Sequence, residues 1–247
     1  RATKGVYEFG SVFKTLTLAA AFDEKIVKPD TEFANLPKSL SCAGFPIREY
    51  DKKIPSNLTA EQILIRSGNI GSVKIGQKIG EEKYKFFLSK LGVLKQINFD
   101  IEEVGKPLKF NWGKCPLATA SFGHGITTTL LQLAKAYSII VNGGYNVKPI
   151  LISNDEHNQQ KRIINEEVSK KILPILRKIV STREGTASLA NVSGYEIGGK
   201  TGTAQKSIDG SYSRRKINSF ISVFPSSKPK FVLALMIDEP KINKDYI

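Results

Sequence analysis

Cysteine, histidine and long apolar segments are all scarce in this chain of 247 residues. Its 2 cysteines, Cys42 and Cys115, are too few and too far apart in sequence for a disulfide framework, and with only 2 histidines no zinc or iron ligand spacing is present. The longest apolar stretches are much shorter than the roughly 18 to 20 residues that a membrane span requires. The composition therefore predicts a globular chain that needs no metal or other cofactor.

Acidic residues are also in the minority. Lys+Arg 37 against Asp+Glu 23 gives a formal net charge of +14, which raises the question of a nucleic-acid or anionic-surface partner. The densest basic cluster is only Arg214, Arg215 and Lys216, and the other lysines are scattered along polar helix faces, where they are solvated. We therefore expect no nucleic-acid partner.

The hydrophobic period changes along the chain from helical to strand-like. An apolar pattern over 11–22 predicts a buried helix, whereas 23–57 contains four prolines and predicts a long irregular segment. Thr59 and Gln62 form a capping box that opens the next helix. The remaining helices are expected toward 79 and over 81–91, 127–142 and 165–181, and the strands over 198–203, 217–224 and 230–237. Helices followed by antiparallel strands indicate one α+β domain rather than an alternating α/β array.

Ser11 and Lys14 lie three residues apart at the start of the apolar helix, so that a hydroxyl and an amine share one face. A lysine with an ordinary pKa of roughly 10.4 is no base at neutral pH, but an amine in an apolar site with cationic neighbours loses its proton far more readily. This predicts a serine nucleophile with a lysine base. The simpler interpretation is that Ser11 caps the helix and Lys14 is solvated. The same spacing recurs at Ser213 and Ser227, in polar surroundings.

Ser67, Gly68 and Asn69 connect two expected helices and present a hydroxyl and a carboxamide at their corner. Small polar residues and glycine are the usual residues of such a connection, so the motif taken alone predicts only a turn.

Lys200, Thr201, Gly202 and Thr203 stand at the start of an expected strand. A glycine at a strand edge lets a ligand backbone approach closely, and an amine with two hydroxyls suits a carboxylate. A rival interpretation exists, because residues 194–201 match the phosphate-loop pattern G-x-x-x-x-G-K-[ST]. It fails on context, since no buried strand precedes this segment and no helical pattern follows it.

Ser-x-x-Lys, Ser-x-Asn and Lys-Thr-Gly occur in this order, and the set resembles that of the penicillin-recognising serine acyltransferases. A closer resemblance, to the class B penicillin-binding proteins and among them to the cell-division more than the elongation transpeptidase, rests on five stretches: RATKGVYEFGSVFKT, LIRSGNIGSVKIG, SFGHGITTTLLQLAKAYSIIVNGG, GGKTGTAQK and FVLALMIDEP. The resemblance extends over almost the entire chain. It implies the α+β fold of penicillin-binding transpeptidases and serine β-lactamases, with a helical subdomain and an antiparallel sheet.

Two residues depart from the family pattern. Phe9 stands where the family commonly has proline, and Gly68 stands where it has a second serine. Neither position carries a catalytic group. Family members also have sheet strands before the nucleophile helix and a final helix after the last strand expected here. Residues 1–247 are therefore expected to form a partial transpeptidase domain, incomplete at its N- and C-terminal edges.

The resemblance implies a D,D-transpeptidase that cross-links peptidoglycan stem peptides through an acyl-enzyme on Ser11, with β-lactams as covalent inhibitors. Lys14 is then the base. Ser67 relays a proton to the leaving amine, and Asn69 holds the substrate amide and helps to orient Lys14.

The same resemblance implies that Lys200 supplies a positive potential for the substrate. It also implies that Thr201 and Thr203 donate hydrogen bonds to the terminal carboxylate of the substrate, with Gly202 in the same binding segment. The backbone N–H groups of Ser11 and Thr203 form the oxyanion hole, where the loss of one donor typically costs ~3 to 4 kcal/mol of barrier.

Family proteins are anchored in the inner membrane with this domain on the periplasmic face, and we expect cell-division membrane proteins as partners through a region upstream of this chain. Alternatives stay open. A D,D-carboxypeptidase or β-lactamase differs in using water rather than an amine as acyl acceptor, and a noncatalytic binding module retains Ser11 only as a cap.

Overall fold

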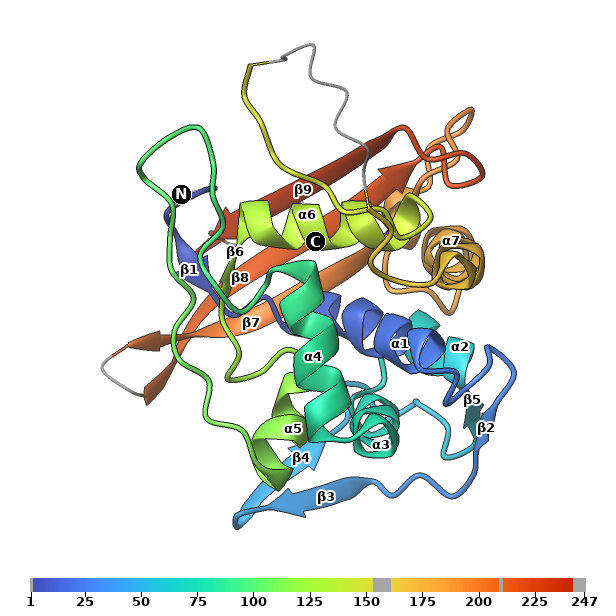
Figure 1. Ribbon diagram of the computed structural model, residues 1–247. Helices are drawn as coiled ribbons and strands as arrows, with labels where there is room; N and C mark the ends of the chain where they lie inside the picture. The colour runs from blue at the N-terminus through green and yellow to red at the C-terminus, as the bar shows by residue number, and fades with distance from the viewer. Residues whose placement is uncertain (1, 153–160, 209–210, 242–247) are drawn as a thin grey trace.

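The structure is a computed structural model that describes residues 2–152, 161–208 and 211–241 (Figure 1). Its helices are α1 (Phe13–Asp23), α2 (Ala60–Ile65), α3 (Asn69–Ile79), α4 (Glu81–Leu91), α5 (Lys114–Ala120), α6 (Leu130–Val141) and α7 (Glu166–Ser181), with short 3-10 turns η1 (Gly10–Val12) and η2 (Ser188–Ala190). The main sheet consists of β7 (Gly198–Ile208), β8 (Ser211–Phe224) and β9 (Phe231–Asp238). The short strands pair as β1 (Val6–Tyr7) with β6 (Thr128–Thr129), β2 (Glu32–Phe33) with β5 (Leu58–Thr59), and β3 (Ser39–Cys42) with β4 (Phe45–Arg48).

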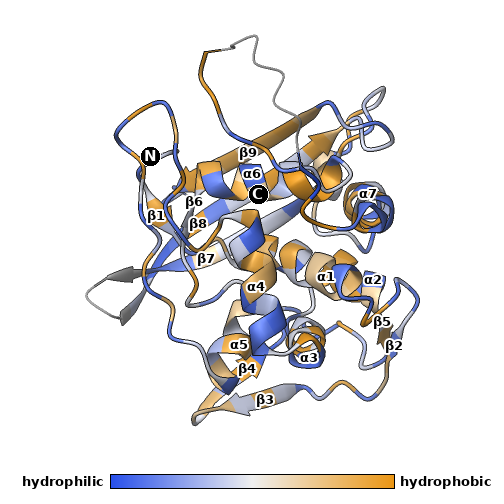
Figure 2. Ribbon diagram, in the orientation of Figure 1, coloured by the Kyte–Doolittle hydropathy of each residue, from blue (hydrophilic) through white to orange (hydrophobic). Residues whose placement is uncertain are grey.

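The sheet is antiparallel throughout, in the order β7–β8–β9, and the expectation of antiparallel strands is confirmed. β7 and β8 extend further than predicted, because their far ends pair with each other beyond residue 203. Helix α7 packs against β7, and α6 packs against β8 and β9 (Figure 1). Side chains of β9 alternate between this covered face and an opposite face, and Figure 2 shows the strand as mainly hydrophobic. The exposed side chains are Phe231, Leu233, Leu235 and Ile237.

Helix α1 is buried on every side, as its apolar pattern predicted. All residues from Phe13 to Phe22 are buried, because α2, α3, α4, α6 and α7 surround the helix. The polar Thr17 is satisfied inside, with its hydroxyl bonded to the Ser121 carbonyl and the Tyr84 hydroxyl at 2.9 and 2.8 Å. The helix therefore holds its first turn in a fixed position within the core.

Local capping chemistry sets the ends of the surrounding helices. The predicted capping box is confirmed: the Thr59 hydroxyl accepts the N–H of Gln62, and the Gln62 side chain accepts the N–H of Thr59. Helix α6 begins with the same box at Thr129 and Gln132, later than the start predicted at 127. Helix α4 has the predicted bounds, and α7 continues through Pro174. No helix within the described residues has the length and hydropathy to cross a bilayer.

The segment 23–57 contains more regular structure than predicted. Strands β3 and β4 form an antiparallel hairpin whose turn residues, Ala43 and Gly44, have φ values of 50° and 81°. Two positive φ angles in succession are typical of the tight type I′ hairpin turn. The prediction of an irregular segment was wrong here. The two strands are short and mostly exposed, so they show no hydrophobic alternation, and Pro46 is tolerated because it lies at a sheet edge.

Cys42 and Cys115 form a disulfide, contrary to the inference drawn from their spacing. Their Cα atoms lie 5.4 Å apart although 73 residues separate them in sequence. Separation along the chain does not limit proximity in the fold, and that distance is within the usual range for a bridge. The bond ties the β3–β4 hairpin to α5, a short helix that the hydrophobic pattern did not predict.

Candidate active site

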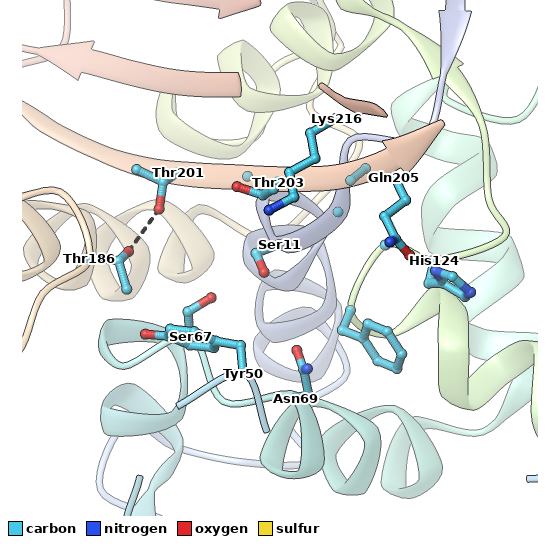
Figure 3. Close-up of a pocket in the computed structure, with 15 residues that line it drawn as sticks. Ser11, Tyr50, Ser67, Asn69, His124, Thr186, Thr201, Thr203, Gln205 and Lys216 are labelled. Atoms are coloured by element: carbon cyan, nitrogen blue, oxygen red, sulfur yellow. Dashed lines mark hydrogen bonds between the residues drawn. The ribbon is translucent and has the colours of Figure 1, made fainter. Parts of the chain in front are cut away.

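The three motifs predicted from sequence meet around one cleft, between the start of α1, the α2–α3 connection and β7. The cleft has a volume of about 750 Å³. Figure 3 shows Ser11 between Thr201 and Thr203 of β7 on one side and Ser67 and Asn69 on the other.

Ser11 lies in η1, immediately before α1, and is partly exposed to the cleft. The N-cap positions are Phe9 for η1 and Val12 for α1, and neither helix has a side-chain capping hydrogen bond. Ser11 therefore does not cap the helix, and the simpler interpretation of this serine loses its support.

Two glycines let the backbone before Ser11 press against β7. Gly10 has φ +59°, and a Cβ added there would lie 2.4 Å from the carbonyl oxygen of Thr203. A Cβ at Gly202 would lie 2.3 Å from the carbonyl oxygen of Phe9. Only residues without a side chain allow this close approach. It brings the backbone of Ser11 next to that of Thr203, the two segments predicted to supply the oxyanion hole.

Lys14 is buried beneath the cleft, with 1% of its surface exposed. Its amine donates to the Ser67 carbonyl, to the Ser67 hydroxyl at 3.1 Å and to the Asn69 Oδ1 at 2.7 Å. Burial lowers the pKa of Lys14 to about 7, against the opposing effect of the negative charge on Glu49. An amine with this pKa is half neutral near pH 7, which is the property that a general base requires.

Ser67 connects the two lysines of the site. Its backbone has a positive φ of 57°, unusual for serine, and its hydroxyl accepts hydrogen bonds from Lys14 and, at 2.9 Å, from Lys200. Such strained backbone occurs where the surroundings fix it, often at functional sites. The predicted turn is present, and it places the hydroxyl between two amines.

Lys200 is buried, and its amine also donates to the Thr201 carbonyl at 3.0 Å. Burial lowers the pKa of Lys200 well below its usual value, and the positive charge of nearby Lys14 lowers it further. Two buried amines that bond the same hydroxyl favour states in which they do not both carry a proton.

Three hydroxyls lie along the β7 side of the cleft. Thr201 and Thr186 are hydrogen-bonded to each other at 2.9 Å, and Thr203 is exposed (Figure 3). Lys200 and Thr201 are strand residues paired with β8, so the chain after Gly199 is not the helix that a phosphate loop needs. The nucleotide interpretation is thereby excluded on structure as well as on sequence context.

A comparison with protein-family models matches residues 1–246 to the penicillin binding protein transpeptidase domain. This chain belongs to that family. The resemblance inferred from the three motifs is therefore confirmed.

Curated relatives of this penicillin-binding transpeptidase chain include the probable peptidoglycan D,D-transpeptidase FtsI of Caulobacter vibrioides. That protein is 30% identical over 256 residues, which cover 98% of this chain and 43% of the relative. Stage V sporulation protein D of Bacillus subtilis is 32% identical over 251 residues, which cover 95% of this chain and 38% of the relative. The chain spans about two fifths of the length of these relatives.

Solved structures of penicillin-binding proteins share the fold. The TP domain of penicillin-binding protein 3 from Burkholderia pseudomallei matches with a TM-score of 0.90 and 27% identity, over 97% of this chain and 73% of that chain. Penicillin-binding protein 3 of Mycobacterium tuberculosis, complexed with aztreonam, matches with a TM-score of 0.87 and 25% identity, over 97% of this chain and 58% of that chain. The expected penicillin-binding transpeptidase fold is confirmed.

Several cleft residues of this penicillin-binding transpeptidase chain were not found from sequence. Tyr50, His124 and Lys216 line the cleft from three different segments (Figure 3). Glu49 lies just behind it and accepts hydrogen bonds from the N–H groups of Asn69 and Ile70, at 2.6 and 2.9 Å. His124 lies in one of the stretches that carry the family resemblance, but no site role was inferred for it. The other three residues belong to no motif with a fixed spacing, so only the fold brings them to the site.

Proposed function

We propose that this chain is the catalytic region of a serine D,D-transpeptidase that cross-links peptidoglycan stem peptides. The observation that carries the proposal is the buried amine of Lys14, whose pKa is lowered to about 7 and which lies one helical turn from the cleft-facing Ser11. A base with a lowered pKa on the same helix face as a serine can activate the serine as a nucleophile. The names of the curated relatives support the substrate class.

In the first step the Ser11 Oγ forms a bond to the carbonyl carbon of the penultimate D-alanine, and Lys14 takes the hydroxyl proton. The carbonyl oxygen acquires negative charge, which the N–H groups of Ser11 and Thr203 stabilise. Because Gly10 and Gly202 let these two backbones approach, the oxyanion site is preformed, and such preorganised donors contribute much of the barrier reduction.

In the second step the amide C–N bond breaks. The proton held on Lys14 passes through the Ser67 hydroxyl to the leaving D-alanine amine, so that the lysine is neutral again. The hydrogen bonds of 3.1 and 2.9 Å from Lys14 and Lys200 to this hydroxyl support a relay role for it. The acyl group remains on Ser11 as an ester.

The terminal carboxylate of the substrate binds at the β7 side, to the hydroxyls of Thr201 and Thr203, in the segment that contains Gly202. Without substrate, burial and Lys14 lower the pKa of Lys200. An arriving carboxylate favours the protonated amine, so Lys200 supplies its positive charge when the anion is present. Asn69 orients Lys14 and has an amide within reach of the substrate.

The ester is resolved when the amino group of a second stem peptide attacks it, which forms the cross-link and frees Ser11. A β-lactam presents the same carbonyl and carboxylate, and the amine of its opened ring cannot leave, so it acylates Ser11 as an inhibitor.

We further propose that the whole protein acts at the periplasmic face of the inner membrane with cell-division membrane proteins as partners. Residues 1–247 would be one part of its transpeptidase domain.

Covalent labelling by a fluorescent penicillin tests the proposal. We expect the label to survive denaturation in the unaltered chain and in Ser213→Ala, the matched control from the second Ser-x-x-Lys copy, and to be absent in Ser11→Ala. Since Ser11 makes no capping bond, the free energy of unfolding should change by less than about 0.5 kcal/mol. A labelled Ser11→Ala chain would show that the nucleophile is another residue.

The acyl acceptor is tested separately. A donor peptide ending in D-Ala-D-Ala is incubated with the chain and an amine acceptor, and the products are separated by mass. Cross-linked product with D-alanine release supports transpeptidation, whereas D-alanine release with only the shortened peptide indicates a carboxypeptidase. A penicillin that is released by rapid hydrolysis would indicate a β-lactamase.

A further inference from the structure

We propose that Glu49 is a positioning residue for the acylation reaction: it holds Asn69 at the start of α3, and the amide oxygen of Asn69 in turn accepts a hydrogen bond from the Lys14 amine. The inference rests on the proposed serine acyltransfer. It adds a residue outside the three motifs, on the segment that follows the β3–β4 hairpin.

The first function of Glu49 is to complete the N-terminus of α3. The N-cap of this helix is Gly68, which has no side chain and makes no capping bond. The first N–H groups of a helix need an acceptor when they are not solvated, and the helix dipole favours a negative charge there. Glu49 supplies both, because its two oxygens accept the N–H groups of Asn69 and Ile70 at 2.6 and 2.9 Å.

The second step is that these contacts determine where the Asn69 side chain points. The side-chain NH₂ of Asn69 donates a hydrogen bond to the carbonyl oxygen of Arg48, the residue before Glu49, at 2.8 Å. With the backbone N–H and the side-chain NH₂ both bound to consecutive residues of one segment, the remaining amide oxygen faces Lys14 at 2.7 Å. Residues 48–49 therefore act as a clamp that fixes the acceptor for the Lys14 amine.

The third step concerns charge. Among the described residues, the charged groups that interact electrostatically with Lys14 are Lys200 from β7 and Glu49 from residues 48–49, while Ser67 and Asn69, which bond the amine directly, do not titrate. Burial lowers the pKa of Lys14, and Glu49 raises it. Without the negative charge of Glu49, Lys14 would lose its proton at a lower pH, and the pH range of the reaction would shift downward.

The experiment changes the carboxylate in two different ways, by two substitutions. Glu49→Gln keeps the length and one acceptor oxygen but loses the charge, and Glu49→Asp keeps the charge but is one methylene shorter. Glu82→Gln is the matched control, since it makes the same change in the first turn of α4, away from the cleft. Acylation rates with a β-lactam are measured from pH 5.5 to 9.5, together with thermal unfolding of each variant.

We expect the acidic limb of the rate profile to move to lower pH in Glu49→Gln and to stay in place in Glu49→Asp. The plateau rate should fall by about tenfold or more in Glu49→Asp, because a misplaced reacting group lowers the rate steeply. A residue with only a structural role would lower the melting temperature of the Gln variant without moving the limb. An unmoved limb in Glu49→Gln, or an Asp plateau equal to that of the control, would overturn the proposal.

A second readout does not need acylation. The ε-carbon resonance of Lys14, followed by NMR against pH, should titrate at lower pH in Glu49→Gln than in the unaltered chain. If the unaltered chain fails to react with penicillin, the proposed function is refuted, while this titration still decides whether Glu49 sets the proton affinity of Lys14. An unchanged Lys14 titration in Glu49→Gln would overturn the charge effect directly.

Discussion

The buried Lys14 amine predicts the pH dependence of the proposed acylation. Its surroundings hold hydroxyl, carbonyl and amide groups, and burial lowers the pKa to about 7. The neutral fraction of an amine with this pKa is about 10% at pH 6 and about 90% at pH 8, from the ordinary titration relation. If Lys14 is the base, the acylation rate should therefore rise about tenfold between these two pH values.

The assay is single-turnover acylation by a β-lactam whose own charge is constant between pH 5.5 and 9.5. The change in absorbance as the β-lactam ring opens gives the acylation rate, and mass spectrometry of the intact protein gives the acylated fraction. Because Lys200 titrates in the same cavity, the measured midpoint belongs to the coupled pair of amines. A rate that is flat from pH 6 to 8, or that rises only above pH 9 as for an ordinary lysine, would refute the assignment of Lys14 as base.

Further predictions concern the same amine, the carboxylate side and the disulfide. Lys14→Arg should abolish acylation nearly as completely as Lys14→Ala, because arginine keeps the charge but does not give up its proton; a near-normal rate would show that only the charge matters. Lys14→Met should remove part of the pH dependence of folding. The folded pKa of about 7 is below the unfolded value of 10.5, so the free energy of unfolding of the unaltered chain should rise by about 2 to 3 kcal/mol from pH 7 to 9. An equal change between these pH values in both chains, measured by urea unfolding, would contradict this. Thr203→Val should slow acylation by an anionic β-lactam roughly ten- to a hundredfold through loss of one charge-assisted bond, measured by the absorbance assay, and an unchanged rate would place the carboxylate elsewhere. Replacing Cys42 and Cys115 by serine opens a loop closed across 73 residues and should lower the free energy of unfolding by about 4 kcal/mol; identical urea midpoints would show that the bond adds no stability.

Much of the helical layer was predictable because its signals are local. The Thr59–Gln62 box and the amphipathic pattern of α4 need only residues within one or two turns, and both predictions are confirmed. The all-round apolar pattern of α1 also indicated burial correctly. Patterns of this kind give the type and place of an element but no contacts between elements.

The site was predictable as far as its motifs, and not beyond them. Ser11, Ser67 and Lys200 were grouped by their order and by a family resemblance, and the structure brings them to one cleft. Glu49 carries no such signal. It is one acidic residue in a segment predicted to be irregular, and only the pairing of β3 with β4 and the position of α3 bring its carboxylate to the start of that helix.

The bridge between Cys42 and Cys115 has a practical consequence for anyone who studies this chain. Disulfides persist in oxidising compartments and are reduced in the cytosol or in buffers with excess thiol. Reduction would release the hairpin from α5, and this hairpin leads directly into the Arg48 and Glu49 contacts with Asn69. Penicillin binding measured after cytosolic production, or with dithiothreitol present, would therefore report on a loosened site, and thiol titration of each preparation should precede any comparison of rates.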